Sequence, residues 1–228
     1  MREKGQRAVW DRLFSQTPVD KGLAARDWGW LIEPLTEAGV ERVLDLGAGL
    51  GHWSIALARA GFRVTALDIS PVAMARLRAW ADEEGLKIET WTLPAQRLPL
   101  ISSFQAVIAN SVLDHMTLSD AREVIRRLWS VLRPPGLMYL SFDAPEGEAN
   151  RPHVVLPDGT RRYRGGKWDG MLWRPYRDEE ILALCRGFEI LEFTVRASGS
   201  RVVWARKRWP RTEVGCGSWL ADPKMKAC

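Results

Sequence analysis

The first chemically informative feature of the chain is a glycine-rich segment that carries an acid. It reads Asp45-Leu46-Gly47-Ala48-Gly49-Leu50-Gly51 and follows a short apolar run. Glycines at this spacing let the backbone turn sharply and approach a ligand without an intervening Cβ atom. The pattern differs from the G-x-G-x-x-G of dinucleotide sites. A carboxylate just before the first glycine would repel a pyrophosphate, but it suits a ligand that carries an ammonium or sulfonium charge.

A second acid, Asp68, lies 21 residues after Gly47, at the end of the next apolar run. An acid at the end of the second strand of such a unit can accept hydrogen bonds from both hydroxyls of a ribose. The two acids and the glycines between them therefore predict a site for a nucleoside with a cationic, non-phosphorylated extension.

These residues need a scaffold, and residues 41–143 supply one by alternating short apolar runs with helical patterns. We expect strands over residues 43–46, 62–67, 86–91, 104–109 and 137–142, and helices over residues 52–60, 71–84 and 118–132. Ser70 is the expected N-cap of the second helix, and Thr117 or Ser119 that of the third. Strands that alternate with helices of this length predict an α/β fold with a parallel sheet.

The remainder of the chain divides into three further parts. Residues 1–40 are predicted to form a helical cap over the sheet, in front of a domain at 41–206. Within that domain, residues 144–177 form an insert without a clean period, a short helix follows at 178–186, and residues 188–195 and 202–205 read as an antiparallel hairpin. Residues 207–228 form a predicted tail interrupted by glycine and proline.

Composition excludes several classes of protein. The chain has 228 residues, 46% apolar, with three cysteines and three histidines. No apolar run is long enough to span a membrane, no signal peptide is visible at the N-terminus, and neither a disulfide framework nor a metal-ligand spacing is present. We therefore expect a cytoplasmic protein without a metal. The net charge of +5 and the twelve tryptophans also raise the possibility of nucleic-acid binding.

Four segments together resemble the motifs of the class I S-adenosylmethionine-dependent methyltransferases. They are residues 43–51, 64–70, 104–111 and 132–136, in the family's order. The resemblance implies a Rossmann-like three-layer α/β/α sandwich. Its seven-stranded, mostly parallel sheet has the order 3-2-1-4-5-7-6, with strand 7 antiparallel. It also implies S-adenosylmethionine as cofactor and S-adenosylhomocysteine as product.

The same resemblance assigns cofactor-binding residues. They are Trp10, Arg12, Asp45, Gly47, Ala48, Gly49, Asp68, Ile69, Ala95, Gln96, Asn110 and Ser111. Asp45 is expected near the ammonium group, Asp68 at the ribose, and Arg12 at the carboxylate. Pro94 stands where the family usually has an acid that contacts adenine, so that contact must come from elsewhere.

The acceptor side is less defined by the sequence. His115 follows the fourth strand and is the histidine best placed to act as a base, with Asp114 beside it to orient or charge it. In the insert, Tyr163, Arg164 and Trp173 are candidate acceptor contacts, because interleaved cations and rings suit an acidic or planar substrate. The alternative for each of these residues is a structural role.

Three functions remain open at this stage. The first is methyl transfer to an oxygen, nitrogen or sulfur atom of a small molecule, by a monomer or a homodimer without a membrane partner. The second is methylation of a tRNA-type RNA, supported by a charge of +5 in each of the segments 151–177 and 201–228. The third is non-catalytic cofactor binding. The charge slightly favours an anionic or planar small acceptor.

Overall fold

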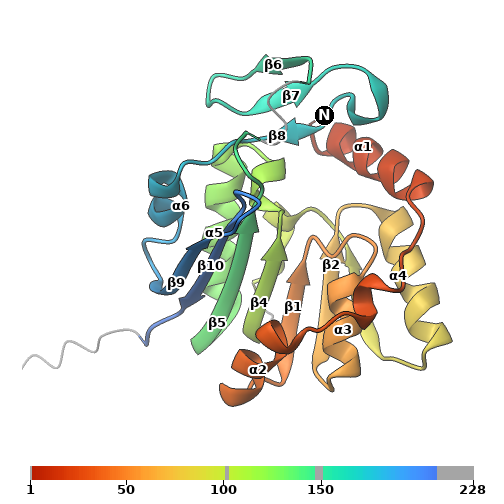
Figure 1. Cartoon of the computed structure of the whole chain (residues 1–228), viewed down its shortest axis with the longest axis vertical. Helices are drawn as coiled ribbons and strands as arrows, with labels where there is room; N and C mark the ends of the chain where they lie inside the picture. Colours follow the sequence, from red (N-terminus) through yellow and green to blue (C-terminus); the bar gives the residue numbers. More distant parts are fainter. Residues whose placement is uncertain (1, 101–102, 147–150, 210–228) are drawn as a thin grey trace, which may run out of the picture.

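The computed structural model describes residues 2–100, 103–146 and 151–209 and contains two sheets (Figure 1). The main sheet has seven strands, namely β1 (Arg42–Leu46), β2 (Arg63–Asp68), β3 (Ile88–Thr92), β4 (Phe104–Asn110), β5 (Leu132–Phe142), β9 (Glu189–Val195) and β10 (Arg201–Arg206). Each predicted strand is therefore present. β5 begins five residues earlier than predicted, directly after the preceding helix.

The strand order of the main sheet is β3-β2-β1-β4-β5-β10-β9. β1 to β5 pair in parallel, and β10 is antiparallel to both β5 and β9. Counted within this sheet, β9 and β10 are strands six and seven, so the order 3-2-1-4-5-7-6 with an antiparallel strand seven is confirmed. The chain leaves β1 toward β2 on one side and later returns to β4 on the other, which is where α/β sheets commonly bind ligands.

Helices cover both faces of the sheet and bury its alternating side chains. One face carries α2 (Gly29–Glu37), α3 (His52–Arg59) and α4 (Pro71–Glu83), and the other carries α5 (Leu118–Val131) and α6 (Asp178–Leu184). In β1, for example, Val43 packs with the first group and Leu44 with the second. This three-layer sandwich matches the predicted fold class. Within the described residues, no helix is long and apolar enough to cross a membrane.

The predicted helix caps are present. Ser70 Oγ accepts a hydrogen bond from Ala73 N at 3.1 Å at the start of α4, and Thr117 Oγ1 accepts one from Asp120 N at 3.3 Å at the start of α5. Such caps satisfy backbone donors that the first helical turn leaves free. They also end the loops that precede them, and both loops lie at the carboxyl edge of the sheet.

The insert forms a second sheet that the sequence did not predict. Its strands β6 (His153–Val155), β7 (Arg161–Tyr163) and β8 (Leu172–Trp173) pair antiparallel in the order β6-β7-β8. Strands of two or three residues are too short to show a period. In Figure 1 this sheet and α1 (Arg2–Gln16) lie above the carboxyl ends of β1, β2 and β4.

The predicted helical cap at residues 1–40 divides between two places. α1 lies at the carboxyl edge and contacts α4 and the 3₁₀ helix η4 (Gly166–Trp168), whereas Leu31 and Leu35 of α2 pack against the sheet face. Three further 3₁₀ helices are η1 (Leu23–Ala25), η2 (Ala95–Arg97) and η3 (Leu113–His115). The predicted tail at 207–228 falls almost wholly outside the described residues.

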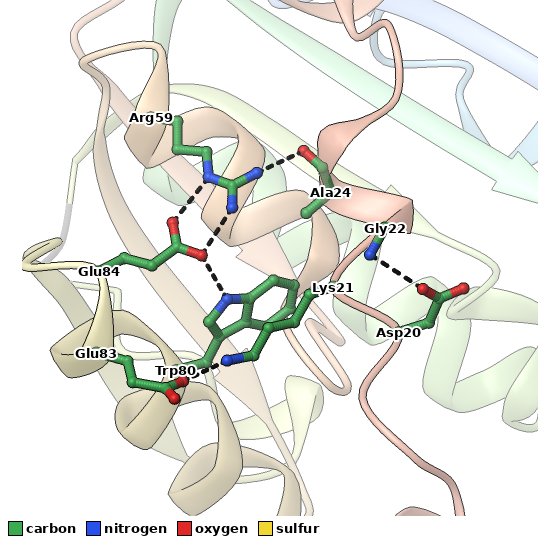
Figure 2. A network of polar contacts seen from close by, with 8 residues as sticks. All are labelled: Asp20, Lys21, Gly22, Ala24, Arg59, Trp80, Glu83 and Glu84. Carbon is green, nitrogen blue, oxygen red and sulfur yellow. Dashed lines mark hydrogen bonds and ion pairs between the residues drawn. The ribbon is translucent and has the colours of Figure 1, made fainter.

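A polar network fixes the segment after α1 to α3 and α4 (Figure 2). Arg59 donates from Nε and one amino group to the two Glu84 oxygens at 2.8 and 2.7 Å, and from its other amino group to the Ala24 carbonyl at 2.9 Å. Trp80 Nε1 donates to the same carboxylate at 2.6 Å. Because of the guanidinium, the pKa of Glu84 lies below its usual range. The network therefore holds η1 against α3, the helix that directly follows the glycine-rich turn.

Candidate active site

A cavity of about 640 Å³ opens at the carboxyl edge of the sheet. Twelve of the predicted site residues line it, namely Trp10, Asp45, Gly47, Ala48, Gly49, Asp68, Ile69, Ala95, Gln96, Asn110, Ser111 and His115. They come from α1, from the ends of β1, β2 and β4 and the loops that follow these strands, and from η2, which follows β3. The topology therefore gathers residues that lie more than 100 positions apart in the chain.

The glycine-rich turn has the backbone conformation that its sequence suggests. Gly47 and Gly49 have φ angles of 68° and 53°, in the left-handed region that favours glycine. A Cβ atom on Gly47 would lie 2.5 Å from Val112 Cγ2. The amides of Gly47 and Ala48 donate to the Leu67 carbonyl at 2.7 and 3.0 Å, so the turn is bound to the end of β2. The result is a cradle of bare backbone along one wall of the cavity.

The Asp68 carboxylate joins the turn to the second strand. Its two oxygens accept hydrogen bonds from Gly49 N at 2.9 Å and from Ser70 N at 2.8 Å. Each oxygen keeps a further lone pair, which leaves the group able to accept from a ligand hydroxyl. The side chain is buried, and this desolvation raises its pKa to about 6.

Asp45 is the more strongly perturbed of the two acids. Ser54 Oγ donates to its carboxylate at 2.5 Å, and the residue is 2% exposed. Burial, opposed by that hydrogen bond, raises the pKa of Asp45 to about 7. A cation placed beside it would favour the ionised form. This environment fits the ammonium or sulfonium charge that the sequence predicted.

The residues predicted to contact the adenine and the amino-acid part of the cofactor also line the cavity. Ile69, Pro94, Ala95 and Gln96 line the cavity together, so the Gln96 side chain is available where Pro94 supplies no acceptor. Ser111 has a φ of 50°, unusual for a residue with a side chain, and its Oγ donates to Asp143 Oδ1 at 2.8 Å.

His115 also lines the cavity, among groups that fix its ring. Its Nδ1 is 3.1 Å from the Leu172 carbonyl, and Trp10 packs against it edge to face with ring centroids 5.0 Å apart. Its Nε2 is 3.8 Å from Asp143 Oδ2. The histidine therefore joins α1, β8 and the loops after β4 and β5.

The neighbouring Asp114 has two partners. We expected Asp114 to orient or charge His115, and a Coulombic interaction between the two groups is present. The Oδ2 atom of Asp114 also accepts the backbone amide of Asp143 at 2.8 Å. The side chain is buried, and desolvation raises its pKa to about 6. It thus ties the loop after β4 to the loop after β5, and the carboxylate nearer to the imidazole Nε2 is that of Asp143.

Four predicted site residues do not line the cavity. Arg12 donates to the backbone carbonyls of Lys167 at 3.2 Å and Asp169 at 2.8 Å, so it holds η4 against α1. Tyr163 and Trp173 are 1% and 0% exposed in an apolar cluster with α1, and Arg164 is exposed. The large aromatic rings form the core of the insert. The sequence alone does not distinguish this role from stacking on a ligand.

Sequence reasoning missed several residues that line the cavity. They are Gln6, Phe14, Val112, Met116, Asp120 and Leu172. The Gln6 amide donates to the Gly170 carbonyl at 2.8 Å and accepts from Leu172 N at 3.3 Å. Phe14 stacks on Trp10 with centroids 5.5 Å apart. The four-residue spacing of Gln6, Trp10 and Phe14 on one face of α1 was the available signal.

The basic residues of the insert lie elsewhere. Arg161 packs over Trp173, and Arg151 and Lys167 pack over Trp168. No lysine or arginine is among the described residues that line the cavity. The charge of the insert therefore lies outside the cavity lining, and the charge beyond residue 209 lies outside the described part of the chain.

Within the part of the chain that the structure describes, one group of side chains has ligand atoms close enough for a metal ion. Asp114, His115 and Asp143 each offer one such atom within 4.8 Å of the others. The absence of a metal stays a prediction, which the effect of EDTA and Mg²⁺ on acceptor binding can test.

The comparisons with known proteins agree with this geometry. Residues 43–136 match a family described as a methyltransferase domain. A ubiquinone biosynthesis O-methyltransferase from Xanthomonas axonopodis pv. citri (strain 306) is 28% identical over 183 residues, which cover 68% of this chain and 76% of that protein.

Two solved structures share the fold. An S-adenosylmethionine-dependent methyltransferase from Clostridium acetobutylicum ATCC 824 has a TM-score of 0.67 at 13% identity, covering 89% of this chain and 97% of that one. A magnesium protoporphyrin IX methyltransferase from Synechocystis PCC 6803, with bound S-adenosylmethionine, has a TM-score of 0.59 at 20% identity, covering 88% and 90%.

The fold, the cavity and these similarities define the class of protein. Residues 43–136 form a methyltransferase domain, and the chain has the fold of the class I S-adenosylmethionine-dependent methyltransferases. The resemblance of the four motifs, all of which lie within residues 43–136, to a methyltransferase is confirmed.

Proposed function

We propose that this methyltransferase acts on a nucleophilic oxygen, nitrogen or sulfur atom of a small molecule. The observation that supports this most is the cavity itself, which continues from the glycine-rich turn to His115 under α1 and β8. Its volume of about 640 Å³ lies within the range of small-molecule sites. The name of the Xanthomonas relative, an O-methyltransferase of ubiquinone biosynthesis, favours the same class of acceptor.

The residues of the turn and of the strand ends fit the cofactor. Backbone at Gly47 and Gly49 would face its methionine part, Asp45 its ammonium group, and Asp68 its ribose. When bound, S-adenosylmethionine supplies a methyl group on a positively charged sulfur, which becomes the neutral thioether of S-adenosylhomocysteine. Because the methyl group is already activated, the protein contributes mainly alignment.

His115 is the proposed general base. Its Nδ1 faces a carbonyl oxygen, which only accepts, so Nδ1 carries the proton and Nε2 keeps a free lone pair in the neutral ring. Nε2 would take the proton that the acceptor loses as its oxygen, nitrogen or sulfur bonds to the methyl carbon. The Asp143 carboxylate at 3.8 Å stabilises the imidazolium that results, and the proton then passes to solvent.

Calorimetry and a rate measurement test the proposal. We expect S-adenosylmethionine and S-adenosylhomocysteine to bind with one site per chain. With an accepted small molecule, His115→Gln should lower the methylation rate about 100-fold, the usual size of general-base catalysis, and leave cofactor affinity unchanged. Failure to bind either compound would refute the cofactor assignment. Methylation of tRNA in place of small acceptors would favour the basic residues of the insert as a binding site.

A further inference from the structure

Among the described residues, two hydrogen-bond acceptors without a hydrogen-bond partner lie beside each other, one on a residue that lines the cavity and one on a residue next to it. One is His115 Nε2, whose lone pair is free because Nδ1 holds the proton. The other is Asp143 Oδ2, 3.8 Å away. That separation is too long for a hydrogen bond between them. The neutral imidazole and the carboxylate are therefore held apart, each able to accept from a third group.

The surrounding contacts keep both acceptors in place. Asp143 Oδ1 accepts from Ser111 Oγ at 2.8 Å, and the backbone amide of Asp143 donates to Asp114 at 2.8 Å. The imidazole is fixed by the Leu172 carbonyl and by Trp10. Groups held from several sides recognise a ligand with little loss of conformational freedom.

The 3.8 Å between His115 Nε2 and Asp143 Oδ2 determines how many donor hydrogens a ligand needs in order to satisfy both acceptors. One amino nitrogen with two hydrogens can lie about 2.9 Å from both atoms and direct its lone pair away from them. Two hydroxyls on neighbouring carbons can each donate to one acceptor. A single hydroxyl has one hydrogen and satisfies one acceptor only. A carboxylate has no hydrogen to donate and meets a like charge.

We propose that the acceptor presents two N–H or O–H donors at its reacting end, as an amine or a vicinal dihydroxy group, and that Asp143 selects for the second donor. This inference rests on the proposed function and deepens it. In the oxygen case, one hydroxyl gives its proton to Nε2 as it bonds to the methyl carbon. The neighbouring hydroxyl keeps its proton and donates to Asp143.

The rest of the acceptor end suits a flat, apolar body behind those donors. Trp10 and Phe14 stack on each other, and Met116 and Leu172 complete the lining. The planar acceptor favoured by the sequence is therefore retained. The anionic character is not retained. The lysine and arginine side chains of the insert do not line the cavity, whereas Asp120 lines it and Asp143 lies beside His115.

Binding of four small probes to the protein saturated with S-adenosylhomocysteine tests the inference. Catechol and aniline offer two donors, phenol offers one, and benzoate offers none. We expect catechol to bind about tenfold more tightly than phenol, since a hydrogen bond to a charged group is usually worth at least that much. Benzoate should bind more weakly than phenol. Tryptophan fluorescence reports binding because Trp10 lines the site.

The variant Asp143→Asn separates selection from structure. It should reduce the preference for catechol over phenol to about threefold or less, because the second hydrogen bond loses its charge. Affinity for phenol and for S-adenosylhomocysteine should not change. The matched control is Asp82→Asn, an exposed aspartate on α4, which should keep the wild-type preference.

Nitrogen NMR of the histidine rings provides a second readout, with only three histidines in the chain. We expect His115 as the Nδ1–H tautomer, with an Nε2 resonance that moves when catechol binds. An Nε2–H tautomer, equal affinities for catechol and phenol, or tight benzoate binding would overturn the inference. So would a catechol preference that EDTA abolishes and Mg²⁺ restores, because a bound cation would then explain it. Loss of S-adenosylhomocysteine binding would instead contradict the proposed function.

Discussion

At the scale of single residues, Asp68 combines a structural and a binding task. Its carboxylate holds the glycine-rich turn through Gly49 N and the start of α4 through Ser70 N. Replacement by alanine removes both anchors and the proposed ribose contact. We expect Asp68→Ala to weaken S-adenosylhomocysteine binding by about 1.5–3 kcal/mol, the usual cost of a lost charged hydrogen bond. Calorimetry measures this, with Asp82→Asn as control, and unchanged affinity would contradict the assignment.

The residues that the sequence identified at the site share one property. Asp45, Gly47 and Asp68 lie next to strand ends, so the strand prediction also fixed where they point. Asp143 also follows a predicted strand, but a lone acid after an apolar run carries no further signal. Its importance depends on the distance to His115, and the sequence separation of 28 positions does not show that distance.

At the scale of elements, α1 and the insert form one unit over the cavity. Val9 and Leu13 of α1 share an apolar cluster with Tyr163, Met171 and Trp173. Arg12 adds two hydrogen bonds to carbonyls of the insert. The sequence predicted helix α1 and a separate pocket-forming insert. It did not predict their union, because contacts between segments 150 residues apart leave no local pattern.

This union predicts that Arg12 matters for order in the insert more than for binding. Arg12→Ala should increase amide hydrogen exchange in residues 163–171, because the carbonyls of Lys167 and Asp169 lose their partner. The loss in global stability should be about 1 kcal/mol or less, as expected for an exposed contact. Arg7→Ala, on the exposed side of the same helix, is the matched control. A tenfold loss of cofactor affinity, with exchange unchanged, would favour the original assignment of Arg12 to the cofactor carboxylate.

At the scale of the whole molecule, the sheet order and the layer arrangement were predictable and the second sheet was not. Strands of five to eleven residues alternate with helices, and that alternation determines the parallel sheet. β6, β7 and β8 have two or three residues each, so they obtain their stability from α1 instead of from their own pattern. The net charge of the insert suggested an anionic acceptor, but no lysine or arginine is among the described residues that line the cavity. Counting charges along the sequence does not show which side chains face a cavity.

The folded molecule holds three buried carboxyl groups, Asp45, Asp68 and Asp114, whose pKa values are raised to between about 6 and about 7. A carboxyl group with a raised pKa binds more protons in the folded state than in the unfolded state. Its stabilising contribution is therefore complete below the unfolded pKa near 3.9 and is lost as the pH rises through the folded value. For Asp45, the difference between the folded and the unfolded pKa corresponds to about 4 kcal/mol in the free energy of unfolding.

Cofactor binding should reverse that effect at Asp45, because an ammonium group beside the carboxyl favours its ionised form. At pH 6.5, we expect binding of S-adenosylmethionine to release about one proton from Asp45, and affinity should rise between pH 5.5 and about 7.5. Calorimetry in two buffers with different ionisation enthalpies counts the protons. Asp45→Asn should remove this release and flatten the pH dependence, whereas Asp82→Asn should change neither. Equal proton release by wild type and Asp45→Asn would show that the cationic part of the cofactor binds away from Asp45.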